Sequence, residues 1–444
     1  MDLFIIGSFI VTPYKVIKDG AILIEGTDIV DVGKARDLKS KYSTRGYEVI
    51  NATNKAIIPG LINTHTHASM SLLRGVADDA ELMDWLNNKI WPIEAKLTPE
   101  DIHVGALLSI IEMLKSGTTT FNDMYFEMEE VAKAVEITGI RAVLSRGLIG
   151  LGNEINEKKS FKEGLTFALK YQDAADGRIK TMLGPHAPYT CSAEYLTDVV
   201  NVAKEHNLPI HIHIAETKQE KKAIEDAFSI NLDNKGIIEY LDSFGFFQVP
   251  VVAAHMVWVD EREYRILKEH DVGIAHNPIS NMKLASGIAP VPSMLEYGLY
   301  IGIGTDGPAS NNSLDMFREM KATALIHKVN TLNPTVVPAL EVLKMGTMYG
   351  AHVLRLDHMI GSIEPGKKAD LVILDLQKAH LSPLHNIVSS LIYSATGCDV
   401  EKVIINGNIV VNDGRVTTVN EQEVLKKAEE HAKALLERAN VTVD

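Results

Sequence analysis

Short hydrophobic runs alternate with longer segments of helical periodicity through the middle of the chain. Eight such runs are each followed by a helical-period segment, at 57–65, 118–124, 141–148, 179–186, 209–216, 249–256, 272–278 and 300–307. Strands that alternate with helices form parallel βα units. Eight units predict an α/β fold, a closed (β/α)8 TIM barrel over residues 59–362. The alternative is a doubly wound open sheet, but no GxGxxG motif opens a helix after the first strand.

Both ends of the chain show a different pattern, in which short apolar runs are separated by turn residues. Such runs fill residues 1–58 and return between 363 and 416, where Asn406-Gly407 is a hairpin signal. The two ends are therefore predicted to form one small β-sandwich domain assembled from both termini. Residues 417–444 are expected to form a C-terminal helical segment, with a helix over 420–438 and Asn420 as its N-cap.

Composition excludes several classes of function. The 444-residue chain has a formal net charge of −14, which argues against nucleic acid as a partner because such binding needs a basic surface. The two cysteines, Cys191 and Cys398, form no CxxC pair, so neither a disulfide framework nor a thiolate zinc site is expected. The apolar run from Leu3 to Val11 is too short to span a membrane. We expect a cytoplasmic protein without a membrane partner.

Polar residues with catalytic chemistry follow the ends of the predicted strands. They are His65, His67, Asp123, Arg146, His186, His213, Glu216, His255, His276 and Asp306. In a TIM barrel the carboxyl ends of the strands form the face that carries the active site. Two further residues are interpreted as lying behind that site. Asp123 is either a support of His65 or His67 through a hydrogen bond or a structural residue, and His211 is a packing residue or a support of a ligand.

A metal site is predicted among these residues. His65 and His67 lie two residues apart on one strand, so both imidazoles point to the same face. His213 comes from the fifth strand, and Asp306 comes from the eighth strand, which lies beside the first in a closed barrel. The four residues can hold one divalent metal ion. Zinc is the first expectation, and iron accepts the same ligands.

Five segments resemble the amidohydrolase superfamily. They are NTHTH after PGL, HIHIAET, AAHMVW, AHNPISNMKLASG and GTDGPASNN, and the resemblance covers nearly the whole chain. Within the superfamily, the pattern is similar to the deaminases of 5′-methylthioadenosine, S-adenosylhomocysteine and 5′-deoxyadenosine. The resemblance implies a metal-dependent hydrolase that converts 5′-modified adenosines, with adenosine itself a candidate, to inosine analogues and ammonia. The implied partner is a small-molecule nucleoside, bound by a homo-oligomer.

Two other functions stay open. Guanine deaminases and chlorotriazine hydrolases share much of the pattern, so another amidohydrolase activity is the first alternative. The second is a catalytically inactive barrel that serves as a scaffold. Relatives of that kind typically lose metal ligands, whereas all four candidate ligands are present in this chain.

The resemblance also bears on the number of metal ions. Two-metal relatives bridge their ions with a carboxylated lysine or a glutamate from a middle strand of the barrel. The matching strands at 141–148 and 179–186 have no lysine at their ends, and Lys180 lies at the start of its strand. One ion is therefore expected.

Three residues beside the metal have implied catalytic roles. Glu216 is placed like the family's glutamate, which contacts the substrate ring and protonates its nitrogen. His255 is expected to hydrogen-bond the attacking water or the developing oxyanion. The carboxylate of Asp306 is expected to bind the ion through one oxygen, accept the water proton through the other, and contact the substrate.

Three further residues have implied contacts with the nucleoside. Glu94 resembles the glutamate that binds the ribose hydroxyls, and His186 resembles a second contact on the ribose side. Arg146 resembles an arginine near the 5′ end. Some relatives that take S-adenosylhomocysteine carry a further arginine beyond the third strand, where this chain has Lys158 and Lys159. This departure favours neutral 5′ groups over the homocysteine group.

Overall fold

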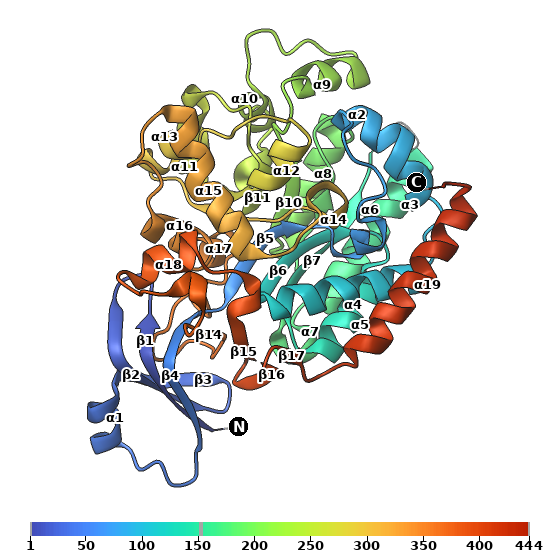
Figure 1. The fold of residues 1–444 in the computed structure, drawn as a ribbon. Helices are drawn as coiled ribbons and strands as arrows, with labels where there is room; N and C mark the ends of the chain where they lie inside the picture. The colour runs from blue at the N-terminus through green and yellow to red at the C-terminus, as the bar shows by residue number, and fades with distance from the viewer. Residues whose placement is uncertain (1, 151–153, 443–444) are drawn as a thin grey trace.

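Parallel strands close into a barrel at the centre of the molecule (Figure 1). The structure, a computed structural model, describes residues 2–150 and 154–442. The barrel strands are β5 (Leu61–Thr66), β6 (Thr118–Tyr125), β7 (Arg141–Leu148), β8 (Ile179–Thr181), β9 (Gly184–Pro185), β10 (Ile210–Ile214), β11 (Val251–His255), β12 (Gly273–His276) and β13 (Ile301–Ile303). Their order is β10-β11-β12-β13-β5-β6-β7-β8, with β9 also paired to β7. A parallel bridge between Leu183 and Ile210 closes the ring, which confirms the predicted TIM barrel.

The first predicted strand, 57–65, is wrong in one respect, because it is two strands. β4 (Glu48–Pro59) belongs to the terminal sheet, and β5 begins the barrel after Gly60. A Cβ atom at Gly60 would lie 2.0 Å from Thr119 Oγ1, so only glycine lets the chain pass from one sheet to the other here. The predicted strand 179–186 is likewise interrupted between β8 and β9.

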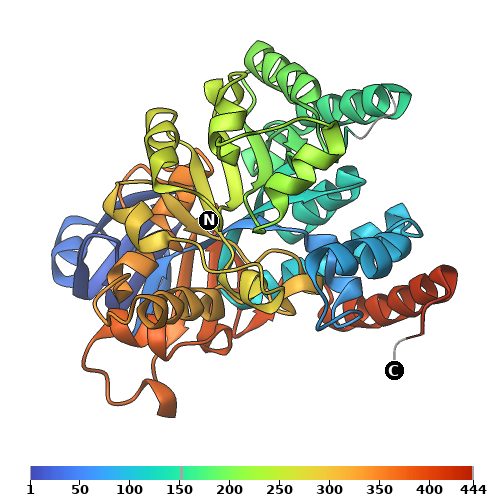
Figure 2. The same ribbon diagram turned by 90° about the horizontal axis from the view of Figure 1, so that it is seen from above.

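Helices follow the strands and form the outer layer (Figures 1 and 2). The longer ones are α4 (Pro99–Lys115), α5 (Met128–Thr138), α6 (Glu154–Tyr171), α8 (Ala193–His206), α9 (Glu220–Phe228) and α15 (Met316–Thr331). The shorter ones are α7 (Ala174–Gly177), α10 (Ile237–Asp242), η3 (Phe246–Gln248), η4 (Glu261–Glu263), α11 (Tyr264–Glu269), α12 (Pro278–Lys283), α13 (Val291–Glu296), α14 (Pro308–Asn311), α16 (Ala339–Met345) and α17 (Met348–Val353). None of the helices that the structure describes has the length and apolar character needed to cross a membrane.

The connection between β5 and α4 carries an insertion over the carboxyl ends of the strands. It contains η1 (Ala68–Leu73), α2 (Leu82–Asp84), η2 (Trp85–Ile90) and α3 (Trp91–Glu94). At the opposite end of the barrel, Ile62 and Val252 near the strand starts share one buried cluster with Ala351 and Val353 of α17. The barrel is thus filled with apolar side chains below the polar strand ends.

The two termini together build the second sheet, as predicted. Its order is β17-β16-β15-β14-β4-β1-β2-β3. The remaining bounds are β1 (Leu3–Val11), β2 (Val16–Glu25), β3 (Asp28–Lys34), β14 (Leu371–Asp375), β15 (Val400–Ile405), β16 (Asn408–Asn412) and β17 (Arg415–Val416), with α1 (Ala35–Lys41), η5 (Ala379–Leu381), α18 (Ile387–Tyr393) and η6 (Gly397–Asp399) beside them. Asn406 and Gly407 have φ values of 49° and 72°, which makes the predicted hairpin between β15 and β16. A bridge from Asp28 to Lys368 brings the sheet back on itself, so it forms a sandwich.

A buried ion pair joins the barrel to this sandwich. Arg141, at the start of β7, donates to both carboxylate oxygens of Asp370 at 2.8 and 3.1 Å, and also to Asn406 Oδ1 at 2.5 Å. Because Arg141 is only 1% exposed, its charge is satisfied by this pairing rather than by water.

The last helix, α19 (Glu421–Ala439), confirms the predicted C-terminal helix. Asn420 caps it by accepting a hydrogen bond from the backbone N–H of Glu423. The helix lies along α4 (Figure 1), where Asp101 accepts hydrogen bonds from His431 and Arg438.

Candidate active site

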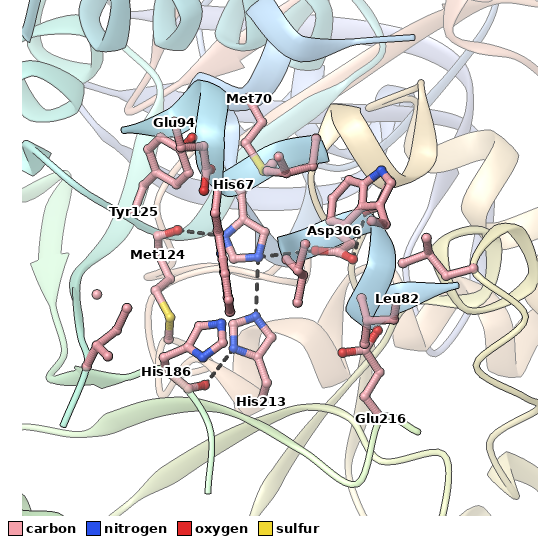
Figure 3. A pocket seen from close by; sticks show the side chains of 18 of the residues that line it. His67, Met70, Leu82, Glu94, Met124, Tyr125, His186, His213, Glu216 and Asp306 are labelled. Atoms are coloured by element: carbon pink, nitrogen blue, oxygen red, sulfur yellow. Dashed lines mark hydrogen bonds and ion pairs between the residues drawn. The ribbon is translucent and has the colours of Figure 1, made fainter. Parts of the chain in front are cut away.

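Three imidazoles, of His65, His67 and His213, and the carboxylate of Asp306 converge at the carboxyl ends of the barrel strands. Figure 3 shows His67, His213 and Asp306 of this cluster. His67 Nε2 and His213 Nε2 are 3.2 Å apart. Asp306 Oδ1 lies 3.2 Å from His65 Nε2 and 3.3 Å from His67 Nε2. The four side chains predicted as metal ligands are therefore brought together, although they come from three separate strand ends.

Hydrogen bonds at the other ring nitrogens orient these imidazoles. His67 Nδ1 donates to Met124 O at 2.6 Å, and His213 Nδ1 donates to His186 O at 2.7 Å. A carbonyl oxygen only accepts, so each Nδ1 carries the proton and each Nε2 keeps a lone pair directed at the cluster. His65 Nε2 is buried and has no hydrogen-bond partner among the described residues. Neutral imidazole lone pairs beside a carboxylate fit a divalent cation.

Of the two residues predicted to lie behind the cluster, one contacts an imidazole and the other does not. His65 Nδ1 lies 2.8 Å from His211 Nε2, and His211 Nδ1 lies 3.3 Å from Ser145 Oγ. The prediction that His211 is a supporting residue is confirmed. The carboxylate of Asp123 instead accepts from the backbone N–H of Ala68 at 2.7 Å, so the predicted hydrogen bond from Asp123 to an imidazole is wrong. The backbone carbonyl of Met124 takes that role for His67, because it accepts the hydrogen bond from the His67 Nδ1–H.

Two serines that the sequence analysis missed hold Asp306. Ser280 and Ser310 donate to Asp306 Oδ2 at 2.6 and 2.9 Å, which leaves Oδ1 facing the histidines. Burial alone would raise the pKa of the Asp306 carboxyl, but the adjacent imidazoles of His65 and His67 hold that pKa well below its usual range. Both serines lie in AHNPISNMKLASG and GTDGPASNN, the segments that carried the resemblance.

A second carboxylate lies beside the cluster. Glu216 Oε2 is 3.7 Å from His255 Nε2, and Ser286 donates to Glu216 Oε1 at 3.4 Å. Asn281 Oδ1 lies 3.0 Å from His255 Nδ1 and fixes the ring. Burial raises the pKa of the Glu216 carboxyl above its usual value. A carboxyl of this kind can carry a proton and release it to a bound molecule.

Four non-glycine residues at these strand ends have left-handed backbone conformations. Their φ values are 55° at Ala215, 73° at His255, 51° at Met256 and 59° at Asp306. Such conformations are costly for residues with a Cβ atom, and they concentrate at functional sites. The turns they make direct the side chains at the ends of β10, β11 and β13 toward the cluster.

The family follows from comparison with known proteins. Residues 56–410 match the Amidohydrolase family. The chain belongs to this family. The resemblance carried by the five sequence segments is thereby confirmed.

Similar proteins share nearly the full length of this amidohydrolase. The chain is 48% identical over 421 residues to a 5-methylthioadenosine/S-adenosylhomocysteine deaminase of Syntrophomonas wolfei, covering 95% of each. It is 48% identical over 422 residues to a 5′-deoxyadenosine deaminase of Methanosarcina barkeri, covering 95% of this chain and 96% of the relative. A crystal structure of an adenosine deaminase from Xanthomonas campestris with bound zinc has a TM-score of 0.91 and 32% identity, with 98% of both chains covered.

A pocket opens beside the histidine cluster of this amidohydrolase. Glu94, His186, Glu216 and His255 line it, together with apolar side chains from the insertion and the strand ends: Met70, Leu82, Trp85, Leu86, Ile90, Trp91, Phe126, Ile149 and Leu284. In Figure 3, Glu94 and Glu216 lie on either side of the His67 ring. Glu94 accepts a hydrogen bond from the Tyr125 hydroxyl. A flat apolar molecule with polar groups at both ends fits such a pocket.

Arg146 does not line the pocket, although its neighbour Gly147 does. The Arg146 guanidinium donates to Glu163 at 2.8 Å and to Glu127 at 3.5 Å, and Glu129 lies 4.0 Å away. The contact of Arg146 with the 5′ end of a nucleoside therefore stays a prediction. Part of the adjacent segment, residues 151–153, lies outside the described residues.

Proposed function

We propose that the protein is a metal-dependent hydrolase that deaminates 5′-modified adenosines to inosine analogues and ammonia. The observation that carries the proposal is the buried Glu216 carboxyl beside a cluster of three imidazoles and Asp306, because deamination needs a proton donor next to an activated water. The names of the Syntrophomonas and Methanosarcina relatives support the substrate class. The inactive-scaffold alternative is disfavoured because all four candidate ligands are present and oriented.

The proposed metal ligands are His65, His67, His213 and Asp306. These residues would hold a divalent ion, which would supply an activated water molecule at neutral pH. Zinc is the proposed ion, which the zinc-bound adenosine deaminase of similar fold supports, and iron is the alternative. A single ion is proposed because the lysine of the middle strands, Lys180, forms an ion pair with Asp173 instead of reaching the cluster.

The proposed proton transfers use three side chains. Asp306 takes the proton of the attacking water, and Glu216 gives a proton to the ring nitrogen next to the carbon under attack. His255 hydrogen-bonds the oxygen that becomes negatively charged. Water adds to the ring carbon, and Asp306 passes the proton that it accepted to the amino nitrogen. The added hydroxyl returns a proton to Glu216 as it becomes the carbonyl, the bond from the ring carbon to the amino nitrogen breaks, and ammonia leaves. Glu216 and Asp306 therefore contact the substrate directly.

The proposed contacts at the other end of the pocket are Glu94 for the ribose hydroxyls and His186 for the ribose side. A carboxylate accepts well from a vicinal diol. Arg146 is retained as a residue near the 5′ end, where its charge is already balanced by Glu163 and Glu127. That balance, like the absence of a further arginine, favours neutral 5′ substituents over the homocysteine group.

A substrate panel tests this proposal. The metal-loaded protein is assayed with adenosine, 5′-deoxyadenosine, 5′-methylthioadenosine, S-adenosylhomocysteine, guanine and a chlorotriazine, by adenine absorbance and ammonia release. We expect turnover of the adenosines, with kcat/KM at least about tenfold higher for the two neutral 5′ groups than for S-adenosylhomocysteine. Turnover of only guanine or the chlorotriazine would overturn the proposal. Equal kcat/KM across the 5′ substituents would overturn the preference for neutral groups.

Three wider expectations are retained as proposals. The chain is divided into a sandwich domain of residues 1–58 and 363–416, a barrel domain of 59–362 and a C-terminal segment of 417–444. The protein works in the cytoplasm on a small nucleoside. It acts as a homo-oligomer and without nucleic acid or membrane partners.

A further inference from the structure

The turn after β10 is held by a buried carboxylate that the sequence analysis did not single out. Glu220, the first residue of α9, is 2% exposed. Its Oε1 accepts from the backbone N–H of Ala215 at 2.9 Å, and its Oε2 accepts from that of Glu216 at 2.8 Å. Burial raises the pKa of this carboxyl to about 7, while the two backbone donors act against that rise by favouring the charged form. The carboxylate therefore binds two successive N–H groups, one with each oxygen.

The same turn is connected to the strand end that carries His255. The Ala215 carbonyl accepts from the backbone N–H groups of Val257 and Trp258, both at 2.9 Å. The Trp258 indole N–H donates to Ser286 O at 2.7 Å, and the Ser286 hydroxyl donates to Glu216 Oε1 at 3.4 Å. A chain of hydrogen bonds thus runs from the backbone carbonyl of Ala215 through Trp258 and Ser286 to the side chain of Glu216.

The backbone conformation explains why this turn needs an external support. Ala215 has a φ of 55°, which is unfavourable for a residue with a Cβ atom. The hydrogen bonds from the N–H groups of Ala215 and Glu216 to Glu220 stabilise this backbone conformation. A carboxylate suits the position because it offers two acceptor oxygens, whereas an amide offers one oxygen and one NH2 group.

We propose that Glu220 is a positioning residue that fixes the Glu216 carboxyl in the geometry needed for proton transfer. The inference rests on the proposed function, since it assigns Glu216 its place in that reaction. Glu220 does not line the pocket, and its carboxylate accepts hydrogen bonds from the backbone of residues 215 and 216.

The first test is Glu220→Gln, which keeps the length of the side chain but loses one acceptor. We expect kcat to fall about 10- to 100-fold, because small displacements of a reacting group have effects of this size, while KM changes less than about threefold. Metal content is expected to be unchanged. The matched control is Asp226→Asn on the exposed face of α9, where activity should equal that of the wild-type chain.

A double-mutant cycle separates positioning from a general loss of structure. In the Glu216→Gln background, the proposal predicts that Glu220→Gln lowers the residual rate by less than about twofold, since the group it positions is already absent. An equal loss in both backgrounds would overturn the proposal. If Glu220→Gln does not give folded protein, Glu220→Asp, shorter by one methylene, enters the same cycle with the same expectation.

Hydrogen exchange tests the role of Glu220 without any measurement of deamination. The amides of Ala215 and Glu216 should exchange faster in Glu220→Gln than in the wild-type chain, with unchanged exchange in α8. Unchanged protection at both amides would overturn the role of Glu220 even if the protein is an active deaminase. Faster exchange in a protein that deaminates none of the adenosines would instead refute the proposed function and leave the backbone clamp established.

Discussion

Glu216→Gln is expected to retain the metal ion and to lose about 10²- to 10⁴-fold in kcat, the usual contribution of a positioned proton donor. Glutamine has the shape of glutamate and can still contact Ser286 and His255, but it cannot deliver the proton that the ring nitrogen must gain. The side chain is 6% exposed, and burial raises the pKa of its carboxyl, which favours the protonated form that the transfer needs. Steady-state ammonia release and elemental analysis on the same preparation measure both quantities.

The control for this substitution is Glu205→Gln, an exposed glutamate on α8 outside the pocket. It should have wild-type kcat and wild-type metal content. Glu216→Gln with kcat within about threefold of the wild-type value would remove the proton-transfer role. Loss of metal in the same variant would show that Glu216 is a ligand rather than a proton donor.

His65→Ala is expected to lose most of the bound metal, with an affinity reduced by more than about 100-fold, and to lose activity in proportion. Removal of residues that only support a ligand already weakens binding by about 10- to 100-fold, so removal of a ligand should exceed that range. His65 Nε2 is buried and has no hydrogen-bond partner among the described residues. An ion held by the proposed ligands would give that atom a partner. Equilibrium dialysis with zinc and elemental analysis measure the loss.

The control for the metal site is His358→Ala, an exposed histidine outside the pocket. It should bind zinc as the wild-type chain does. Full metal content in His65→Ala would refute the assigned ligand set. If His65→Ala retains part of its zinc and added imidazole restores activity, the assigned ligand set is supported. Free imidazole can occupy the space that the His65 side chain left.

The barrel was predictable because its hydrophobic pattern repeats at each strand and depends on local periodicity. The convergence of His65, His67, His213 and Asp306 followed from the closed barrel, which places β13 beside β5 and brings the end of β10 to the same face. The break at Gly60 was not predictable, because it arises from contact with Thr119, which is distant in sequence.

The supports of the site were harder to predict than the site itself. Met124 holds His67 through a backbone carbonyl, which every residue possesses and no side-chain pattern marks. Glu220 acts on backbone N–H groups and looks in sequence like an ordinary acidic residue at the start of a helix. Arg146 was expected at the 5′ end of the substrate, but its pairing with Glu163 depends on how α6 packs against β7.

The most direct test of the central claim is a metal titration of the metal-free protein with zinc, while ammonia release from 5′-deoxyadenosine is followed. The account predicts no turnover without metal, a linear rise in turnover, and a plateau at one zinc ion per chain. Turnover in the metal-free protein, or a plateau only at two ions per chain, would contradict it, and so would a zinc-loaded protein that releases no ammonia from any 5′-modified adenosine.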